Sequence, residues 1–349
     1  MTTIKEIAKL SNVSATTVSN VIHKRYEKVS KEKRQIVEET IEKLNYSPNM
    51  GAMILANKLS KIIGVISFLD GREDESPLLD PYVAGMIGSL EENIRNRGYY
   101  TMLHCSSSSK DLLKIIGNWK FSGLVLMGIE PDMYREVADK IKIPIVLVDS
   151  YFLEKFQKNG VESLIEHFNN VGINDFQGGF AMTEYLIDKG HRNIAFVSDE
   201  KKLHGPGKKR YEGYCSALKK YNVKPFDCFT VSKHQDVRWK RYDKILERGL
   251  PLNITAVFYA SDFYALDCIR FLAVKKISVP DFISVVGFDD SEYAKYSIPP
   301  ITTVKQNLKS KSECAIDRLT YMIENDDNSF SNEVLDTELV IRDSVRDLN

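Results

Sequence analysis

Residues 3–22 read TIKEIAKLSNVSATTVSNVI. Thr3 and Glu6 have the spacing of a capping box, which predicts that a helix begins here. Ser14 is a favourable N-cap for a second helix. Asn12, between the two, tolerates the left-handed backbone that a tight turn requires. The stretch therefore predicts two short helices joined by a tight turn, which is a helix-turn-helix.

The second helix of this stretch gathers its apolar residues on one side. Val18, Val21 and Ile22 are expected to be buried. Small side chains on the opposite face would let the helix backbone lie close in the major groove of DNA. Polar helix faces are also common on solvated surfaces, so the pattern by itself leaves both interpretations open. The outward residues are Ala15, Thr16, Ser19 and Asn20.

Charge is divided unevenly along the 349 residues, although the whole chain is neutral. Residues 1–61 contain 11 Lys/Arg and 6 Asp/Glu (+5), and the remainder contains 37 and 42 (−5). The excess of positive charge in residues 1–61 favours a polyanionic partner at the N-terminal end of the chain.

A third helix, expected from Ser30 to near Asn45, completes a small DNA-binding domain over residues 1–46.

Residues 47–60 predict a short connecting segment. Ser47 is a possible N-cap, and Pro48 suits the first position of a helix. About nine helical residues are too few to be stable alone, because isolated helices need roughly 12–15 residues. Such a helix would fold only against a partner; the alternative is a plain flexible linker.

The remainder, residues 61–349, alternates apolar runs with helical stretches. Runs rich in β-branched residues between helices indicate parallel sheets with crossover helices. Nearly 290 residues with this pattern predict an α/β body of two doubly wound lobes rather than one oversized sheet. The expected strands are 62–69, 99–104, 123–127, 143–149, 194–198, 255–260 and 283–288.

Acidic residues follow several of these strands. In open α/β sheets, ligands bind beyond the carboxyl ends of the strands. Carboxylates converging there would supply paired acceptors for a polyhydroxylated ligand. Each also has an alternative role as the cap of the next helix. The residues in question include Asp70, Asp149, Asp262 and Asp289.

Two N-terminal runs, TIKEIAKLSNVSATTVSNVIHK and VSKEKRQIVEETIEKLNYSPN, resemble the lactose/galactose-repressor (LacI/GalR) family of bacterial transcription regulators. The later runs TAVFYASDFYALDCIRFL and VPDFISVVGFDDSEYAKYSIPPITTVKQN are similar to the effector-binding core of that family. The resemblance implies a body like that of periplasmic sugar-binding proteins. Its first lobe would comprise about 61–161 and 290–322, and its second about 162–289 and 323–349.

The resemblance also implies which residues contact DNA. Ala15, Thr16 and Asn20 match the positions that select bases, and Asn20 has the amide that pairs with adenine. Residues 48–56 match a hinge helix in the minor groove, where Leu55, beside Ala56, would wedge open a base step. Residues that match phosphate contacts, which set register rather than sequence, are Thr3, Ser14, Thr17, Ser19 and Arg34.

Two positions depart from the family pattern at the DNA-binding end. His23 stands where the family often has Asn, which puts one backbone contact in doubt. Gly51 lies within the hinge segment, and Gly costs a helix about 1 kcal/mol relative to Ala.

In the body, the resemblance assigns Asp149, Arg210 and Asp289 to the grip on a small effector. Ser261 and Asp262 match an Asn-Asp pair between the lobes, and Ser in place of Asn removes one amide donor. The predicted effector is a sugar or sugar derivative. Asp70 opens an unusually acidic loop, and the candidates for a stacking aromatic are Tyr82 and, as a weaker one, Trp239.

The sequence gives little support to other classes of function. The chain has no GxSxG or Walker motif, and its six histidines lack metal-ligand spacing, so we expect no catalytic residues, metal or cofactor. No apolar run reaches the ~18–20 residues of a membrane span, and the five cysteines are scattered, so a cytoplasmic protein is expected. Two alternatives remain: a regulator controlled by a protein corepressor, and a sugar-binding protein without DNA function.

The expected partners are double-stranded operator DNA, a small effector and a second copy of the chain. The final run VLDTELVIRDSVRDLN is not followed by a leucine heptad, so a dimer is expected rather than a coiled-coil tetramer. The sequence does not specify whether the effector releases or promotes DNA binding.

Overall fold

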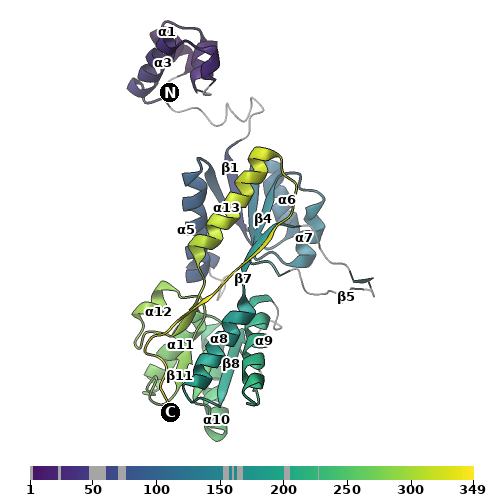
Figure 1. Cartoon of the computed structure of the whole chain (residues 1–349), viewed down its shortest axis with the longest axis vertical. Helices are drawn as coiled ribbons and strands as arrows, with labels where there is room; N and C mark the ends of the chain where they lie inside the picture. Colours follow the sequence, from purple (N-terminus) through teal and green to yellow (C-terminus); the bar gives the residue numbers. More distant parts are fainter. Residues whose placement is uncertain are drawn as a thin grey trace. The chain divides into compact units, whose positions relative to one another are not determined.

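The computed structural model describes residues 3–22, 25–46, 60–69, 76–151, 157–158, 161–162, 168–199, 205–226 and 228–349 (Figure 1). For residues 157–158, 161–162 and 248–252 it describes the backbone alone. The chain divides into two compact units, residues 1–60 and residues 61–349. No helix in the described part of the chain is long and apolar enough to cross a bilayer.

The smaller unit contains the predicted helix-turn-helix. The capping box of Thr3 and Glu6 is present at the start of the first helix, and Asn12 adopts a φ of 50° in the turn. Its core is formed by Ile7, Ala8, Val18, Val21 and Val37. The elements are α1 (Ile4–Leu10), α2 (Ala15–Ile22), the 3-10 turn η1 (Tyr26–Lys28) and α3 (Lys31–Lys43).

The larger unit contains a six-stranded sheet with helices on both faces, which forms the first lobe (Figure 1). The strand order is β13-β7-β4-β3-β1-β2, with every pair parallel. The strands are β1 (Ile62–Ser67), β2 (Tyr100–Cys105), β3 (Gly123–Met127), β4 (Ile145–Val148), β7 (Asn170–Ile173) and β13 (Asn332–Leu335). One face packs on α5 (Pro81–Asn96) and α13 (Leu308–Asn325), and the other on α6 (Ser109–Asn118) and α7 (Pro131–Ala138).

The second lobe is built on a four-stranded parallel sheet of order β11-β10-β8-β9. Its strands are β8 (Ile194–Asp199), β9 (Phe229–Val231), β10 (Ala256–Tyr259) and β11 (Ser284–Val286). One face packs on α8 (Asp175–Asp188) and α9 (Gly205–Lys220), and the other on α10 (Gln235–Leu252) and α11 (Asp262–Val274). The short α12 (Glu292–Tyr296) follows β11. All seven predicted strands are therefore present.

The chain passes between the lobes at three points. It leaves the first sheet after β7, returns through β12 (Thr303–Lys305) into α13, and leaves again after β13 into β14 (Glu338–Val340), which pairs antiparallel with β12. Minor elements are η2 (Pro77–Leu79) and the two-residue pair β5 (Gln157–Lys158) and β6 (Val161–Glu162).

The predicted lobe boundaries at 161/162, 289/290 and 322/323 were wrong. Ala294 and Ile301 pack in the core of the second lobe, so that lobe extends beyond residue 289 to about β12. Both β7 and β13 pair in the first sheet, so the first lobe extends to about residues 173 and 335. β7 reads NVGI and β13 reads NEVL, so polar residues or glycine interrupt the apolar ones, and β13 is also largely exposed. They therefore lack the apolar run that signals a strand, and it is their pairing partners that place them in the first sheet.

Candidate functional site

The outward face of α2 presents the residues predicted to read bases. Ala15 and Thr16 are exposed, and Asn20 is half-buried at the other end of the helix. Val18 and Val21 are buried against the rest of the unit. The helix therefore shows a small, polar surface to solvent because its apolar side is held by the three-helix core.

The turn before α2 is shaped by hydrogen bonds of the predicted phosphate-contact residues. Ser14 Oγ accepts from the backbone N–H of Thr17 at 3.1 Å and lies 2.9 Å from Thr17 Oγ1. Both residues line a shallow hollow together with Lys9 and Lys33. Free N–H groups at a helix N-terminus and two ammonium groups suit a phosphate. The sequence analysis missed both lysines, because only the fold brings α1 and α3 to this turn.

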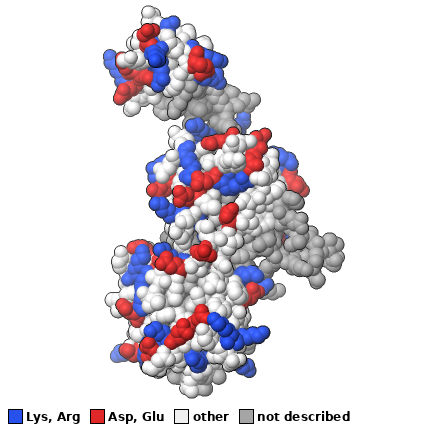
Figure 2. Space-filling view, in the orientation of Figure 1, with Lys and Arg blue, Asp and Glu red and all other residues white. Residues whose placement is uncertain are grey.

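Arg34 is oriented by its own unit. Its guanidinium lies 3.6 Å from the centre of the Tyr26 ring, and its Nε donates to Glu38 Oε1 at 2.8 Å. Figure 2 likewise shows acidic side chains among the basic ones on the visible face of this unit. A phosphate contact by Arg34 would therefore compete with Glu38.

Several predicted residues cannot be placed. His23, Leu55, Ala56 and the rest of the hinge segment up to residue 59 lie outside the described residues, as does Asp70.

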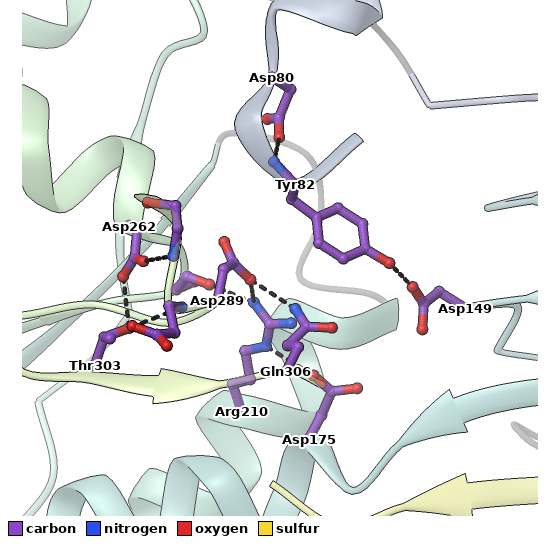
Figure 3. Close-up of polar contacts among 12 residues, drawn as sticks. Asp80, Tyr82, Asp149, Asp175, Arg210, Asp262, Asp289, Thr303 and Gln306 are labelled. Atoms are coloured by element: carbon purple, nitrogen blue, oxygen red, sulfur yellow. Dashed lines mark hydrogen bonds and ion pairs between the residues drawn. The ribbon is translucent and has the colours of Figure 1, made fainter. Parts of the chain in front are cut away.

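In the larger unit, Arg210 lies at the centre of a buried polar cluster (Figure 3). Its Nε donates to Asp175 Oδ1 at 2.8 Å, and its Nη1 donates to the carbonyl oxygen of Ala260 at 2.5 Å. Its guanidinium stacks 3.6 Å above the Phe288 ring. Nη1 also lies 3.6 Å from Asp289 Oδ1. The guanidinium is thus held in place by α8, by the end of β10 and by the loop after β11.

Two further carboxyl groups belong to this cluster: Asp289, which lies beside the arginine and is largely buried, and Asp262, which is fully buried. Gln306 Nε2 donates to Asp289 Oδ1 at 2.6 Å. Asp262 accepts from Thr303 Oγ1 at 2.6 Å and from the backbone N–H of Ser291 at 2.7 Å. Burial raises the pKa of Asp289 to about 8, against the opposing charge of Arg210, and burial raises the pKa of Asp262 to about 6. Asp289 is therefore more easily protonated than an ordinary aspartate, and its protonated form can donate as well as accept a hydrogen bond.

Asp149 supplies the carboxylate on the first-lobe side of the cluster. It follows β4 directly, and the Tyr82 hydroxyl donates to its Oδ2. Tyr82 lies in the first turn of α5, which Asp80 caps through Oδ1. Asp149 and Asp289 have positive φ values of 51° and 125°, and such strained backbone is common at binding sites.

The structure thus brings Tyr82, Asp149, Arg210 and Asp289 into one region, with Asp262 next to Thr303 at the left of the view (Figure 3). Ser261 also lies there, and its buried Oγ has no hydrogen-bond partner among the described residues. That hydroxyl can serve a ligand.

Trp239 is not part of this cluster, and its prediction as a second stacking aromatic was wrong. Its indole Nε1 donates to the carboxylate of Asp267 at 3.2 Å. Its ring packs edge-on against Phe271, with ring centres 5.6 Å apart. Trp239 therefore belongs to the packing of α10 on α11, because it lies on the α10 face turned towards that helix.

Four cluster residues escaped the sequence analysis. Asp175 follows β7, the strand that had no apolar signal, and Tyr151 OH donates to it at 2.5 Å. Gln306 and Lys311 lie at the second crossing between the lobes and in α13. Their positions at the site depend on that crossing, which no local pattern reveals.

Comparison with known proteins gives two family matches. Residues 3–49 match the model of bacterial regulatory proteins of the lacI family, and residues 183–345 match a periplasmic binding protein-like domain. The chain is 33% identical to the HTH-type transcriptional repressor PurR of Histophilus somni (strain 2336), with 100% of both chains covered. It is 31% identical to the repressor of the same name from Pasteurella multocida (strain Pm70), over 99% of each chain.

Solved structures resemble the whole chain as well. A complex of the transcriptional regulator CelR with cellobiose has a TM-score of 0.69 and 25% identity, covering 99% of this chain and 100% of that one. The lac repressor dimer bound to operator and the anti-inducer ONPF has a TM-score of 0.80 and 24% identity, covering 99% of both chains.

Proposed function

This chain belongs to the lacI family of bacterial regulatory proteins and is a DNA-binding transcriptional repressor; from that premise we propose how it binds its operator and what controls it. It binds a near-palindromic operator as a homodimer in the cytoplasm. A small polar effector bound between the two lobes changes its affinity for that operator. The observation that best supports DNA binding is the face of small side chains that α2 exposes to solvent. The apolar residues of the same helix are already buried in the core of the smaller unit.

A dimer places two α2 helices on successive major grooves, about one helical turn of DNA or a small multiple apart. The operator is then a near-palindrome. Titration of labelled promoter fragments in rising salt tests DNA binding directly, because phosphate neutralisation makes affinity fall with salt. Lack of salt-sensitive binding to any candidate operator, with or without small molecules, would overturn the proposal.

Asn20→Ala is expected to cost about 1–3 kcal/mol of binding free energy, mainly at one base pair. Its side chain carries the paired donor and acceptor that a base edge requires, and it lies on the outward face of α2. Binding to a set of operators with single base changes measures the effect. Lys33→Ala is the matched control: its ammonium lines the hollow beside Ser14, so it should weaken all operators alike. Equal loss across all operators for Asn20→Ala would contradict base reading.

The homodimer proposal is supported by an exposed apolar patch beside α12. Tyr293, Tyr296 and Ile298 are 62%, 75% and 90% exposed, and contiguous exposed apolar side chains commonly mark protein interfaces. The lac repressor, which this chain resembles, is described as a dimer bound to its operator, so we propose a second copy of the chain as the occupant of this patch.

Ile298→Asp should convert the dimer to monomers, since the new carboxylate would be buried without a partner at the interface. Analytical ultracentrifugation across micromolar concentrations measures the change. Val237→Asp, at an exposed position in the first turn of α10, is the control and should remain dimeric. A dimer of unchanged stability in Ile298→Asp places the interface elsewhere.

For the effector, we propose a sugar or sugar derivative. Support comes from the convergence of Asp149, Asp289 and Arg210, which offers fixed acceptors and donors to hydroxyl groups, and from the likeness to a regulator complexed with cellobiose. A shift in the melting temperature of the full-length protein, screened over sugars and over nucleobases as a second class, tests this. Coupling is reciprocal, so a true effector must also change operator affinity, and operator DNA must change effector affinity by the same factor.

A regulator of the same family controlled by a protein corepressor is the competing proposal. It predicts that no small molecule alters operator binding, while a captured protein partner does.

A further inference from the structure

Lys311 is a fully buried lysine at the first-lobe wall of the cluster, with an exposed side-chain fraction of 0%. Its Nζ donates to Asp149 Oδ1 at 2.8 Å and Oδ2 at 3.0 Å, and to Gln306 Oε1 at 2.8 Å. It also lies 3.4 Å from the Tyr82 hydroxyl oxygen. This single ammonium therefore joins groups from α5, from the end of β4 and from the link between β12 and α13.

The partners of Lys311 explain how its charged ammonium can be fully buried. An isolated ammonium is costly to bury and tends to lose its proton. Here a carboxylate lies within contact distance, and three donors find acceptors. The ion pair of Lys311 and Asp149 carries no net charge. Asp149 can therefore accept hydrogen bonds at the site, but its negative charge is balanced and its position is fixed.

The other charges of the cluster are also paired. Among the described residues, Arg210 pairs with Asp175 at 2.8 Å, and Arg342 pairs with Asp290. Arg210 Nη1 also lies 3.6 Å from Asp289 Oδ1, and Asp262 accepts hydrogen bonds from Thr303 and Ser291. Burial raises the pKa of Asp262 to about 6 and that of Asp289 to about 8. A phosphate or carboxylate ligand would thus meet cations that are already engaged and acids that repel it as they ionise.

Resting on the proposed function, we propose that Lys311 determines the charge specificity of the effector site. By neutralising Asp149 and fixing it against Gln306 and Tyr82, Lys311 makes the site select an uncharged polar effector. Without the ammonium, Asp149 becomes an uncompensated buried carboxylate. The site then favours a cationic ligand such as an amino sugar. Lys311 is a positioning residue, since its donors point at protein acceptors.

The ligand half of the test uses sets of compounds that differ only in charge. Glucose, glucose 6-phosphate and glucosamine form one set, and ribose with ribose 5-phosphate another; adenine with adenosine monophosphate extends the test beyond sugars. Isothermal titration of the full-length wild type should show the neutral member binding at least about tenfold more tightly than its phosphate, a measurable step in affinity. Lys311→Met should weaken the neutral member and rank the amino sugar first. A wild type that prefers a phosphate, or a variant with unchanged ranking, overturns the proposal.

The pairing half needs no ligand. Lys311→Met, Asp149→Asn and the double variant form a cycle in which the melting temperature is measured at pH 7. Lys311→Met should melt well below the wild type, and adding Asp149→Asn should recover part of the loss, because the stranded carboxylate is gone. Lys309→Met, an exposed lysine on the same helix, is the control and should leave the melting temperature nearly unchanged.

The two halves separate the possible failures. A double variant no more stable than Lys311→Met shows that the lysine does not neutralise Asp149, whatever the ligands do. If the cycle shows coupling but the wild type binds only nucleobases, the sugar proposal fails and the charge specificity stands. If no compound binds at all, the small-molecule effector is overturned along with the specificity built on it.

Discussion

Arg210→Met is expected to abolish the response of operator binding to the effector and to lower the free energy of unfolding by about 3–5 kcal/mol. Arg210 and Asp175 have side-chain exposures of only 8% and 1%. Removing the guanidinium leaves Asp175 buried without its ion-pair partner, and Asp289 loses the cation that lies 3.6 Å from its Oδ1. Denaturant unfolding gives the stability, and operator titration with and without the identified effector gives the response.

The double variant Arg210→Met/Asp175→Asn separates these two effects. It should recover much of the stability, because no unpaired charge remains buried, while the effector response stays lost. Arg241→Met serves as a control, since Arg241 is half-buried on α10 and its guanidinium donates to Thr230 on β9, not to a residue of the cluster. Wild-type stability in the single variant would show that Arg210 is not bound as tightly as its contacts indicate.

The second large effect is a loss of stability as pH rises. Burial raises the pKa of Asp289 from 3.8 to about 8 and that of Asp262 from 3.8 to about 6. A carboxyl group with a raised pKa favours the folded state while it is protonated. Its contribution is therefore complete below pH 3.8 and is lost as pH rises through the folded value. For Asp289 the loss approaches, as an upper bound, on the order of 5 kcal/mol by pH 8.

Asp289→Asn isolates this contribution, because the amide keeps the shape of the protonated acid and never ionises. The free energy of unfolding of wild type minus that of Asp289→Asn, measured from pH 4 to pH 8, should fall steadily as pH rises. Parallel curves for the two proteins would rule out a raised pKa at Asp289. Asp289→Ala, which removes the polar group altogether, should abolish the effector response while leaving operator binding intact.

The DNA-binding unit could be predicted almost completely from local sequence. The Thr3–Glu6 capping box, the left-handed Asn12 and the Ser14 cap each act within a few residues of their own position. The same holds for most of the predicted strands, whose apolar runs are buried; β2, by contrast, has only exposed and half-buried residues. In these elements the interactions that determine the local structure are formed by residues of the element itself.

The lobe boundaries and much of the effector site could not be predicted in this way. The sequence analysis indicated Asp149, Arg210 and Asp289 because they follow strands or match a family motif. Lys311 and Gln306 were missed, and Trp239 was assigned wrongly.

The difference has a physical cause. Caps, turns and buried strands depend on interactions between residues that are close together in the chain. The local sequence is therefore enough to predict residues 3–46 and the central strands. Whether Lys311 meets Asp149, 162 positions earlier in sequence, or Trp239 meets Asp267 instead of a ligand, depends on how elements pack after the chain has crossed between two sheets. Burial and charge pairing across that distance exist only in the folded protein, and they decide which polar groups a ligand can reach.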